Sequence, residues 1–157
     1  MSDPERAREA AQWLKIADED RRVALSCRLM TPPAINSAAY HCQQAAEKLL
    51  KGLLVLAGVH FPKTHDLLAL SQLAAPFYPE DRAILAETIP LTAWAVVYRY
   101  PGVEEQSSPE ESELDDALAL ITRLAVRLRQ FVDPIVPEPQ MPEEGPESSL
   151  SPPDGID

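Results

Sequence analysis

The chain has 157 residues, of which 14 are Lys or Arg and 25 are Asp or Glu, so its formal net charge at pH 7 is −11. This acidity argues against a protein that coats nucleic acid through net charge. The longest wholly apolar stretch, Ala93 to Tyr98, is too short to cross a membrane. Because the first ten residues are charged and polar, we expect no secretory signal and a cytoplasmic location.

Residues 133–157 differ in composition from the rest of the chain. They contain seven prolines, seven acids and no base, and without them the net charge is −4, from 18 acids and 14 bases. Such a segment buries too little apolar surface to offset the entropy of ordering. The composition predicts a helical bundle over residues 1–132 and an acidic, Pro-rich, disordered tail over 133–157. A solubilising role is the simplest one for such a tail.

Within residues 1–132, apolar residues recur at helical spacing and prolines separate the segments. The first helix is predicted to begin at Asp3 as its cap and to end before Pro32. The second covers about 34–57 and ends at Gly58, a residue suited to the position after a helix end. The third is short, about 66–75.

Two further helices complete the prediction. The fourth covers about 79–98, with Pro90 expected to kink or split it. The fifth begins with Ser108 as cap and Pro109 at its first position, and ends near Phe131. Short connections between these elements predict an all-α fold, an up-and-down antiparallel bundle of four to five helices.

The second helix has two chemically distinct faces. Ala, Leu and Cys side chains occupy one side, and residues 36–53 place amides, His41, Glu47 and two lysines on the other. One interpretation is a solvated face with intrahelical pairs such as Glu47–Lys51. The other is a face that contacts a phosphate, a base or a partner chain.

The two cysteines, Cys27 and Cys42, form no CxxC metal motif. They lie on neighbouring antiparallel helices but are offset along the helix axis, so no disulfide is expected. We expect reduced, buried thiols and no metal site.

Four motifs occur in the order and spacing of one known family. The run YHCQQAAEKLLKGLL, residues 40–54, resembles the signature helix of the HEPN family (higher eukaryote and prokaryote nucleotide-binding domains). Trp13-Leu14 with Ala17 and the acidic residues 18–20 resembles the first helix of that family. Residues 61–67 (FPKTHDL) resemble its link to the third helix, and residues 98–101 (YRYP) resemble the end of its fourth.

This resemblance implies an all-α bundle that forms a homodimer and is often encoded beside a small nucleotidyltransferase. Many members are metal-independent ribonucleases, in which an Arg is followed by a His after four to six intervening residues. Arg99 stands at the position of that Arg, but the positions for the His hold Glu104, Glu105 and Gln106. The usual ribonuclease mechanism is therefore disfavoured, and a ribonuclease toxin with a degenerate site remains the alternative.

The remaining role in the family is binding. The resemblance implies a nucleotide- or substrate-binding or partner module without a cofactor, a homodimer that acts with a small nucleotidyltransferase in a toxin–antitoxin-like or defence pair. Nucleotide and RNA are the expected ligands, because Lys and Arg supply charge for phosphate and Tyr100 can stack on a base. The candidate ligand- or phosphate-binding residues are His41, Gln44, Lys48, Lys51, His65, Asp66, Arg99 and Tyr100.

Three alternatives stay open from the sequence. Asp66 or its neighbour Thr64 suits the cap of the third helix. Arg99 suits a structural ion pair with Asp20 or Glu47. The whole chain also suits an assembly domain that binds no ligand.

Overall fold

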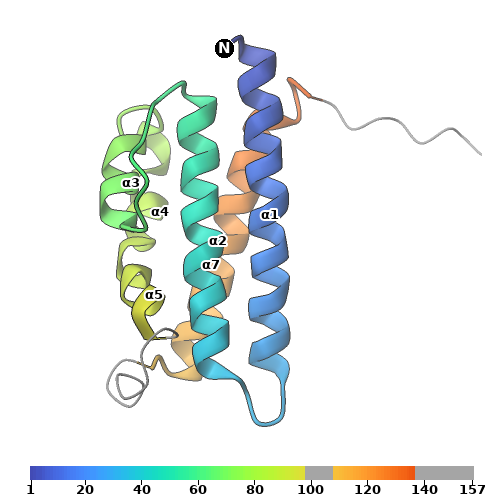
Figure 1. The fold of residues 1–157 in the computed structure, drawn as a ribbon, viewed down its shortest axis with the longest axis vertical. Helices are drawn as coiled ribbons and strands as arrows, with labels where there is room; N and C mark the ends of the chain where they lie inside the picture. Colours follow the sequence, from blue (N-terminus) through green and yellow to red (C-terminus); the bar gives the residue numbers. More distant parts are fainter. Residues whose placement is uncertain (98–107, 137–157) are drawn as a thin grey trace, which may run out of the picture.

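Three long helices form the body of the protein in a computed structural model that describes residues 1–97 and 108–136. They are α1 (Asp3–Leu29), α2 (Ile35–Leu56) and α7 (Glu111–Val132). Figure 1 shows α1 running down the molecule, with α2 and α7 running up beside it. The described residues contain helices and no strand. The prediction of an all-α antiparallel bundle is confirmed.

Short helical segments form the fourth side of the bundle, beside α2 (Figure 1). Pro90 lies in the middle of this layer, within a 3-10 turn, so the predicted fourth helix is split as a proline requires. The end expected for it at Tyr98 lies outside the described residues. The segments are α3 (Leu67–Ala74), η1 (Pro79–Asp81), α4 (Arg82–Glu87), η2 (Ile89–Ala93) and α5 (Trp94–Val97).

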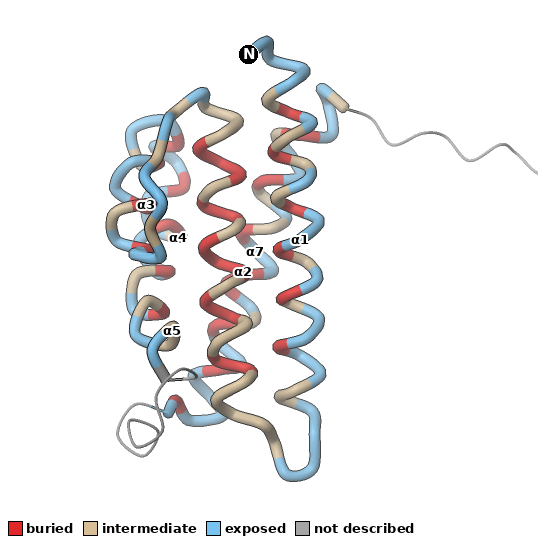
Figure 2. The backbone as a smooth tube through the Cα atoms, in the orientation of Figure 1, coloured by how far each residue is buried: buried red, intermediate tan, exposed pale blue. Residues whose placement is uncertain are grey.

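The core is built mainly from Ala and Leu side chains of α2 and the helices around it. Figure 2 shows buried positions recurring along α2, which touches α1, α3, α5 and α7. At Gly52 the helices approach closely, because a Cβ atom there would lie 2.7 Å from Cδ2 of Leu128 and 3.2 Å from Cβ of Trp13. Among the described residues, no helix combines the length and the apolar character that a membrane crossing needs.

Helix α1 begins one residue earlier than a cap at Asp3 would place it. Its cap is Ser2, and Asp3 is the first helical residue. The carboxylate of Glu5 accepts a hydrogen bond from the backbone N–H of Ser2 at 2.7 Å. Glu5 lies three residues after Ser2 and completes a capping box with it, so Ser2 is the cap of α1. The prediction of Asp3 as cap is wrong.

Helix α7 begins in the same way. Its cap is Glu110, whose backbone N–H donates to the carboxylate of Glu113 at 2.8 Å. The predicted cap, Ser108, lies outside the helix and its hydroxyl donates to the side-chain oxygen of Asn36 at 2.7 Å. The prediction of Ser108 as cap is wrong, because a contact with α2 takes its hydroxyl.

The ends of the long helices agree better with the sequence. Helix α2 ends at Leu56, and Gly58 adopts a left-handed backbone with φ of 71°. After α7, the backbone N–H groups of Ile135 and Val136 both donate to the carbonyl of Val132, at 2.9 and 3.0 Å. Four residues of the predicted tail thus continue as a turn, and residues 137–157 lie outside the described part.

Both cysteines are free thiols, as predicted. Cys42 is buried in the core, and this burial raises the pKa of its thiol to about 12. Cys27 is only half-buried. The expectation of a buried thiol therefore holds for Cys42 alone.

Candidate functional site

The polar side of α2 is covered by neighbouring elements. Gln43 is fully buried, Glu47 is 4% exposed, and the side chain of Lys51 is 12% exposed. Helix α1 lies along one side, and the link of residues 57–66 returns down the other (Figure 1). The prediction that Gln43 and Glu47 face solvent is therefore wrong. Helical periodicity shows which residues share a face of α2, but it cannot show that the link of residues 57–66 folds back over that face.

A first cluster, which we call the Asp20 group, consists of Asp20, His41 and Lys48. The carboxylate of Asp20, on α1, lies 2.8 Å from Nδ1 of His41 and accepts a hydrogen bond from Nζ of Lys48. A carboxylate only accepts, so Nδ1 of His41 carries the proton that faces Asp20. With His41 neutral, Asp20 and Lys48 cancel and the group has no net charge.

A second cluster, the Glu47 group, consists of Gln43, Gln44, Glu47, Lys51 and His65. The carboxylate of Glu47 accepts from Nζ of Lys51 at 2.6 Å, from Nδ1 of His65 at 3.0 Å and from the amide of Gln43 at 3.2 Å. Burial alone raises the pKa of Glu47, but the hydrogen bonds from Lys51 and His65 outweigh it and lower the pKa. Glu47 is therefore an anion that balances the Lys51 charge.

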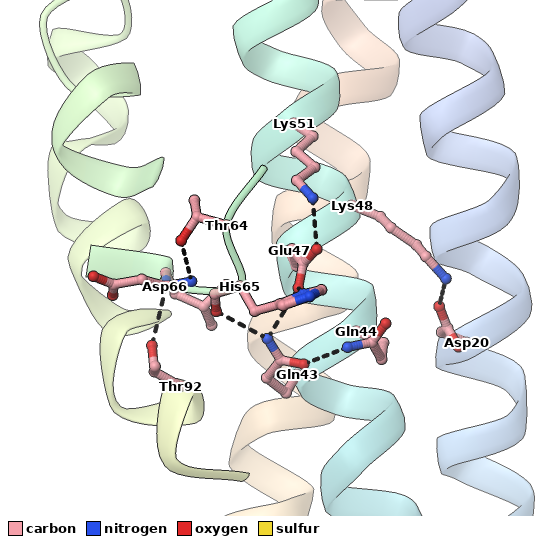
Figure 3. Close-up of polar contacts among 11 residues, drawn as sticks. Asp20, Gln43, Gln44, Glu47, Lys48, Lys51, Thr64, His65, Asp66 and Thr92 are labelled. Carbon is pink, nitrogen blue, oxygen red and sulfur yellow. Dashed lines mark hydrogen bonds and ion pairs between the residues drawn. The ribbon is translucent and has the colours of Figure 1, made fainter. Parts of the chain in front are cut away.

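Glu47 also sets the orientation of both glutamines. Because a carboxylate cannot donate, Gln43 turns its N–H groups toward Glu47 and toward the carbonyl of His65, the latter at 3.3 Å. Its amide oxygen then accepts from Nε2 of Gln44 at 2.7 Å. Within residues 1–97 and 108–136, the side-chain oxygen of Gln44 accepts no hydrogen bond. Figure 3 shows this series of contacts from Lys51 through Glu47 and Gln43 to Gln44.

The two lysines point away from each other. In Figure 3, Lys48 reaches toward Asp20 on α1, whereas Lys51 reaches toward Glu47. Nζ of Lys51 also lies 5.8 Å from the ring centroid of Trp13 and 6.0 Å from that of Phe61. Lys48 and Lys51 therefore belong to two separate neutral groups and do not form one cationic patch.

The other candidate residues have different positions. Asp66 caps α3, because its carboxylate accepts from the backbone N–H of Leu68 at 2.9 Å, and this is one of the two interpretations left open for it. Arg99 and Tyr100 lie outside the described residues, as do positions 104–106. The structure thus brings together His41 with Lys48, and Gln44 with Lys51 and His65.

Three residues of these clusters were not among the predicted site residues: Asp20, Gln43 and Glu47. Two sequence signals pointed to them. The acidic run at 18–20 interrupts the apolar pattern of the first helix, and Gln43, Glu47 and Lys51 follow each other at four-residue spacing. Over residues 1–97 and 108–136, no three His, Cys, Asp or Glu side chains are grouped so as to hold a metal ion.

Comparison with known proteins identifies the family of this fold and this helix. The family model for the HEPN domain matches residues 10–129, which is most of the chain. The chain therefore belongs to the HEPN domain family. Searches of curated proteins and of solved structures each gave no match.

Proposed function

We propose that the chain is a HEPN-type binding module whose ligand surface is formed by the Asp20 and Glu47 groups. The observation that carries this proposal is the pair of buried carboxylates, which hold two histidines and two lysines from α2 and the link in fixed orientations. Fixed donors and acceptors at a surface favour recognition, because little side-chain entropy is lost when a ligand binds. A nucleotide, whose phosphates accept from Lys and His, is the proposed ligand.

We further propose that the module is a homodimer that pairs with a small nucleotidyltransferase in a toxin–antitoxin-like or defence system. Membership of the family supports this pairing. Light scattering would give a mass of twice 17.3 kDa for a homodimer. Co-expression with a nucleotidyltransferase from a neighbouring gene, followed by purification through a tag on one chain, tests the pairing. Recovery of the tagged chain alone would contradict it.

Nucleotide binding is tested by titrating ATP and GTP against the wild type and a Lys48→Gln/Lys51→Gln variant. We expect at least about a tenfold loss of affinity, because each lysine donates a charge-assisted hydrogen bond to phosphate. Lys63→Gln is the matched control, since Lys63 is exposed in the link of residues 57–66 and belongs to neither group.

Glutamine is preferred to alanine because it can still donate to Asp20 and Glu47, which would otherwise be left unpaired. Thermal unfolding of each variant shows that the fold is kept. Unchanged affinity in the double variant would place the nucleotide elsewhere. If neither ATP nor GTP binds, the proposal of nucleotide binding is contradicted. The pairing with a nucleotidyltransferase is then tested separately by co-purification.

A further inference from the structure

A groove lies between α7 and the short helical segments, and it includes no residue of the Asp20 or Glu47 group. One hollow of about 460 Å³ lies between α4 and α7, and a second of about 330 Å³ lies between α7, η2 and the start of α5. Glu87 lines both hollows, so they meet at the end of α4. On α7 the groove follows one face of the helix from Glu113 to Arg127, about 21 Å at 1.5 Å per residue.

The floor of the groove is apolar and partly open to solvent. Ile84 of α4 and Trp94 of α5 line it and are half-buried, and Leu91 of η2 lies between them in the chain. Opposite them, Val126 of α7 is 43% exposed. An open apolar strip of this length offers area that the apolar face of one docked helix can bury, over about four turns.

The rim of the groove is acidic. Among the described residues that line it, five are acids and two are bases. Both bases already pair within the groove, Arg127 with Asp81 at 2.7 Å and Arg123 with Glu87 at 2.6 Å. The negative charge in excess comes from the three remaining acids, Glu80, Glu113 and Asp116.

We infer that this groove docks a basic amphipathic helix of a partner protein. The apolar face of that helix packs on Ile84, Trp94 and Val126, and its Lys or Arg side chains face the acidic rim. Complementary charge speeds the encounter and fixes the orientation of the docked helix. A second copy fits less well, because the chain has 25 acids and 14 bases, and residues 133–157 contain no base at all. The groove and the proposed nucleotide surface share no residue, so either can fail without the other.

The first test uses a model peptide of about 15 residues, built from Leu, Ala and Lys so that Leu and Lys fall on opposite faces of a helix. We expect it to bind the full chain at least about tenfold more tightly than a peptide of the same composition whose order mixes the two faces. Backbone amide NMR signals of α4, η2 and α7 should shift. Equal affinity for the two peptides, or shifts confined to α1 and α2, would overturn the inference.

The second test changes the floor. Val126→Arg places a long cation in the groove and should weaken binding of the amphipathic peptide at least about tenfold. Val23→Arg is the matched control, because Val23 is 41% exposed on α1. Thermal unfolding of both variants shows that the fold is kept. Unchanged affinity in Val126→Arg would contradict docking in the groove.

The third test changes the rim. Glu80→Gln/Asp116→Asn removes two charges and should weaken peptide binding about tenfold at low salt, with a smaller difference at high salt. Glu9→Gln/Glu19→Gln removes two charges from α1 instead and should leave the affinity nearly unchanged. Equal losses in the two double variants would show that net charge alone attracts the peptide, and the inference would fail.

Light scattering of the free protein tests the other occupant, a second copy. We expect the same mass for the wild type and for Val126→Arg. A wild-type dimer that becomes a monomer in Val126→Arg would show that the groove is a contact between copies, and the inference of a separate partner would be wrong.

Discussion

At the scale of single residues, Glu47 is the centre of the Glu47 group, because Gln43, Lys51 and His65 all donate to its carboxylate. It ties α2 to the link through His65 and fixes Gln43 and, through it, Gln44. The sequence indicated only the Glu47–Lys51 pair, which the structure confirms at 2.6 Å. The contact with His65 joins residues 18 positions apart, so no pattern within one helix could reveal it.

Acid should weaken the protein through Glu47. Its pKa in the folded state is lowered from the ordinary 4.5, because donors from Lys51 and His65 overcome the effect of burial. A lowered pKa stabilises the fold above the unfolded-state pKa, and this stabilisation is lost as pH falls through the folded-state pKa. We expect the free energy of unfolding, from urea titrations, to fall between about pH 5 and pH 3.

A Glu47→Gln variant should show a smaller fall over that range and a stability lower by about 1–3 kcal/mol at pH 7. Glu19→Gln is the control, because Glu19 is an exposed acid on α1. The same acid dependence in Glu47→Gln as in the wild type would show that Glu47 is not a source of this effect.

At the scale of elements, the prolines and the apolar spacing predicted the helices well, and the caps less well. Pro90 splits the fourth helix, and α2 ends where Gly58 predicts. Ser108 was a misleading signal, because its hydroxyl bonds to Asn36 of another helix. A cap is decided by competing partners for one side chain, and sequence spacing shows only the local ones.

The close approach of α1, α2 and α7 predicts a cost for any side chain at Gly52. In Gly52→Ala the new methyl group would meet Leu128 and Trp13. We expect a loss of about 1–3 kcal/mol from overpacking, offset by up to about 1 kcal/mol from the better helix propensity of Ala. Thermal and urea unfolding would measure the difference.

A double-mutant cycle isolates the packing contribution. Leu128→Ala opens space at Gly52, so the combined variant should lose less stability than the sum of the two single losses. Additive losses would show that Gly52 and Leu128 do not compete for the same volume.

At the scale of the whole molecule, the sequence predicted the fold class and the antiparallel helices. It did not predict that the link of residues 57–66 covers the polar face of α2. The link crosses α2 because of contacts that include His65 with Gln43, and Thr92 with the backbone N–H of Leu67 at 3.2 Å. These are long-range contacts, so the sequence predicted one polar face of α2 but not its division into two separate groups.

Removal of residues 137–157 should leave the bundle intact. Their composition is acidic and Pro-rich, and the described core is complete within residues 1–132. We expect the thermal midpoint of the truncated chain to stay within about 2 °C of the full chain. A fall of more than about 5 °C would show that the tail stabilises the bundle.

The position of Lys51 beside Trp13 has a practical consequence. An ammonium group near an indole alters the emission of that indole, so a ligand that draws Lys51 away should change the Trp13 fluorescence. The chain has only one other tryptophan, Trp94, which a Phe substitution would silence. The protein therefore carries its own optical reporter, and occupancy of the surface can be followed without any attached dye.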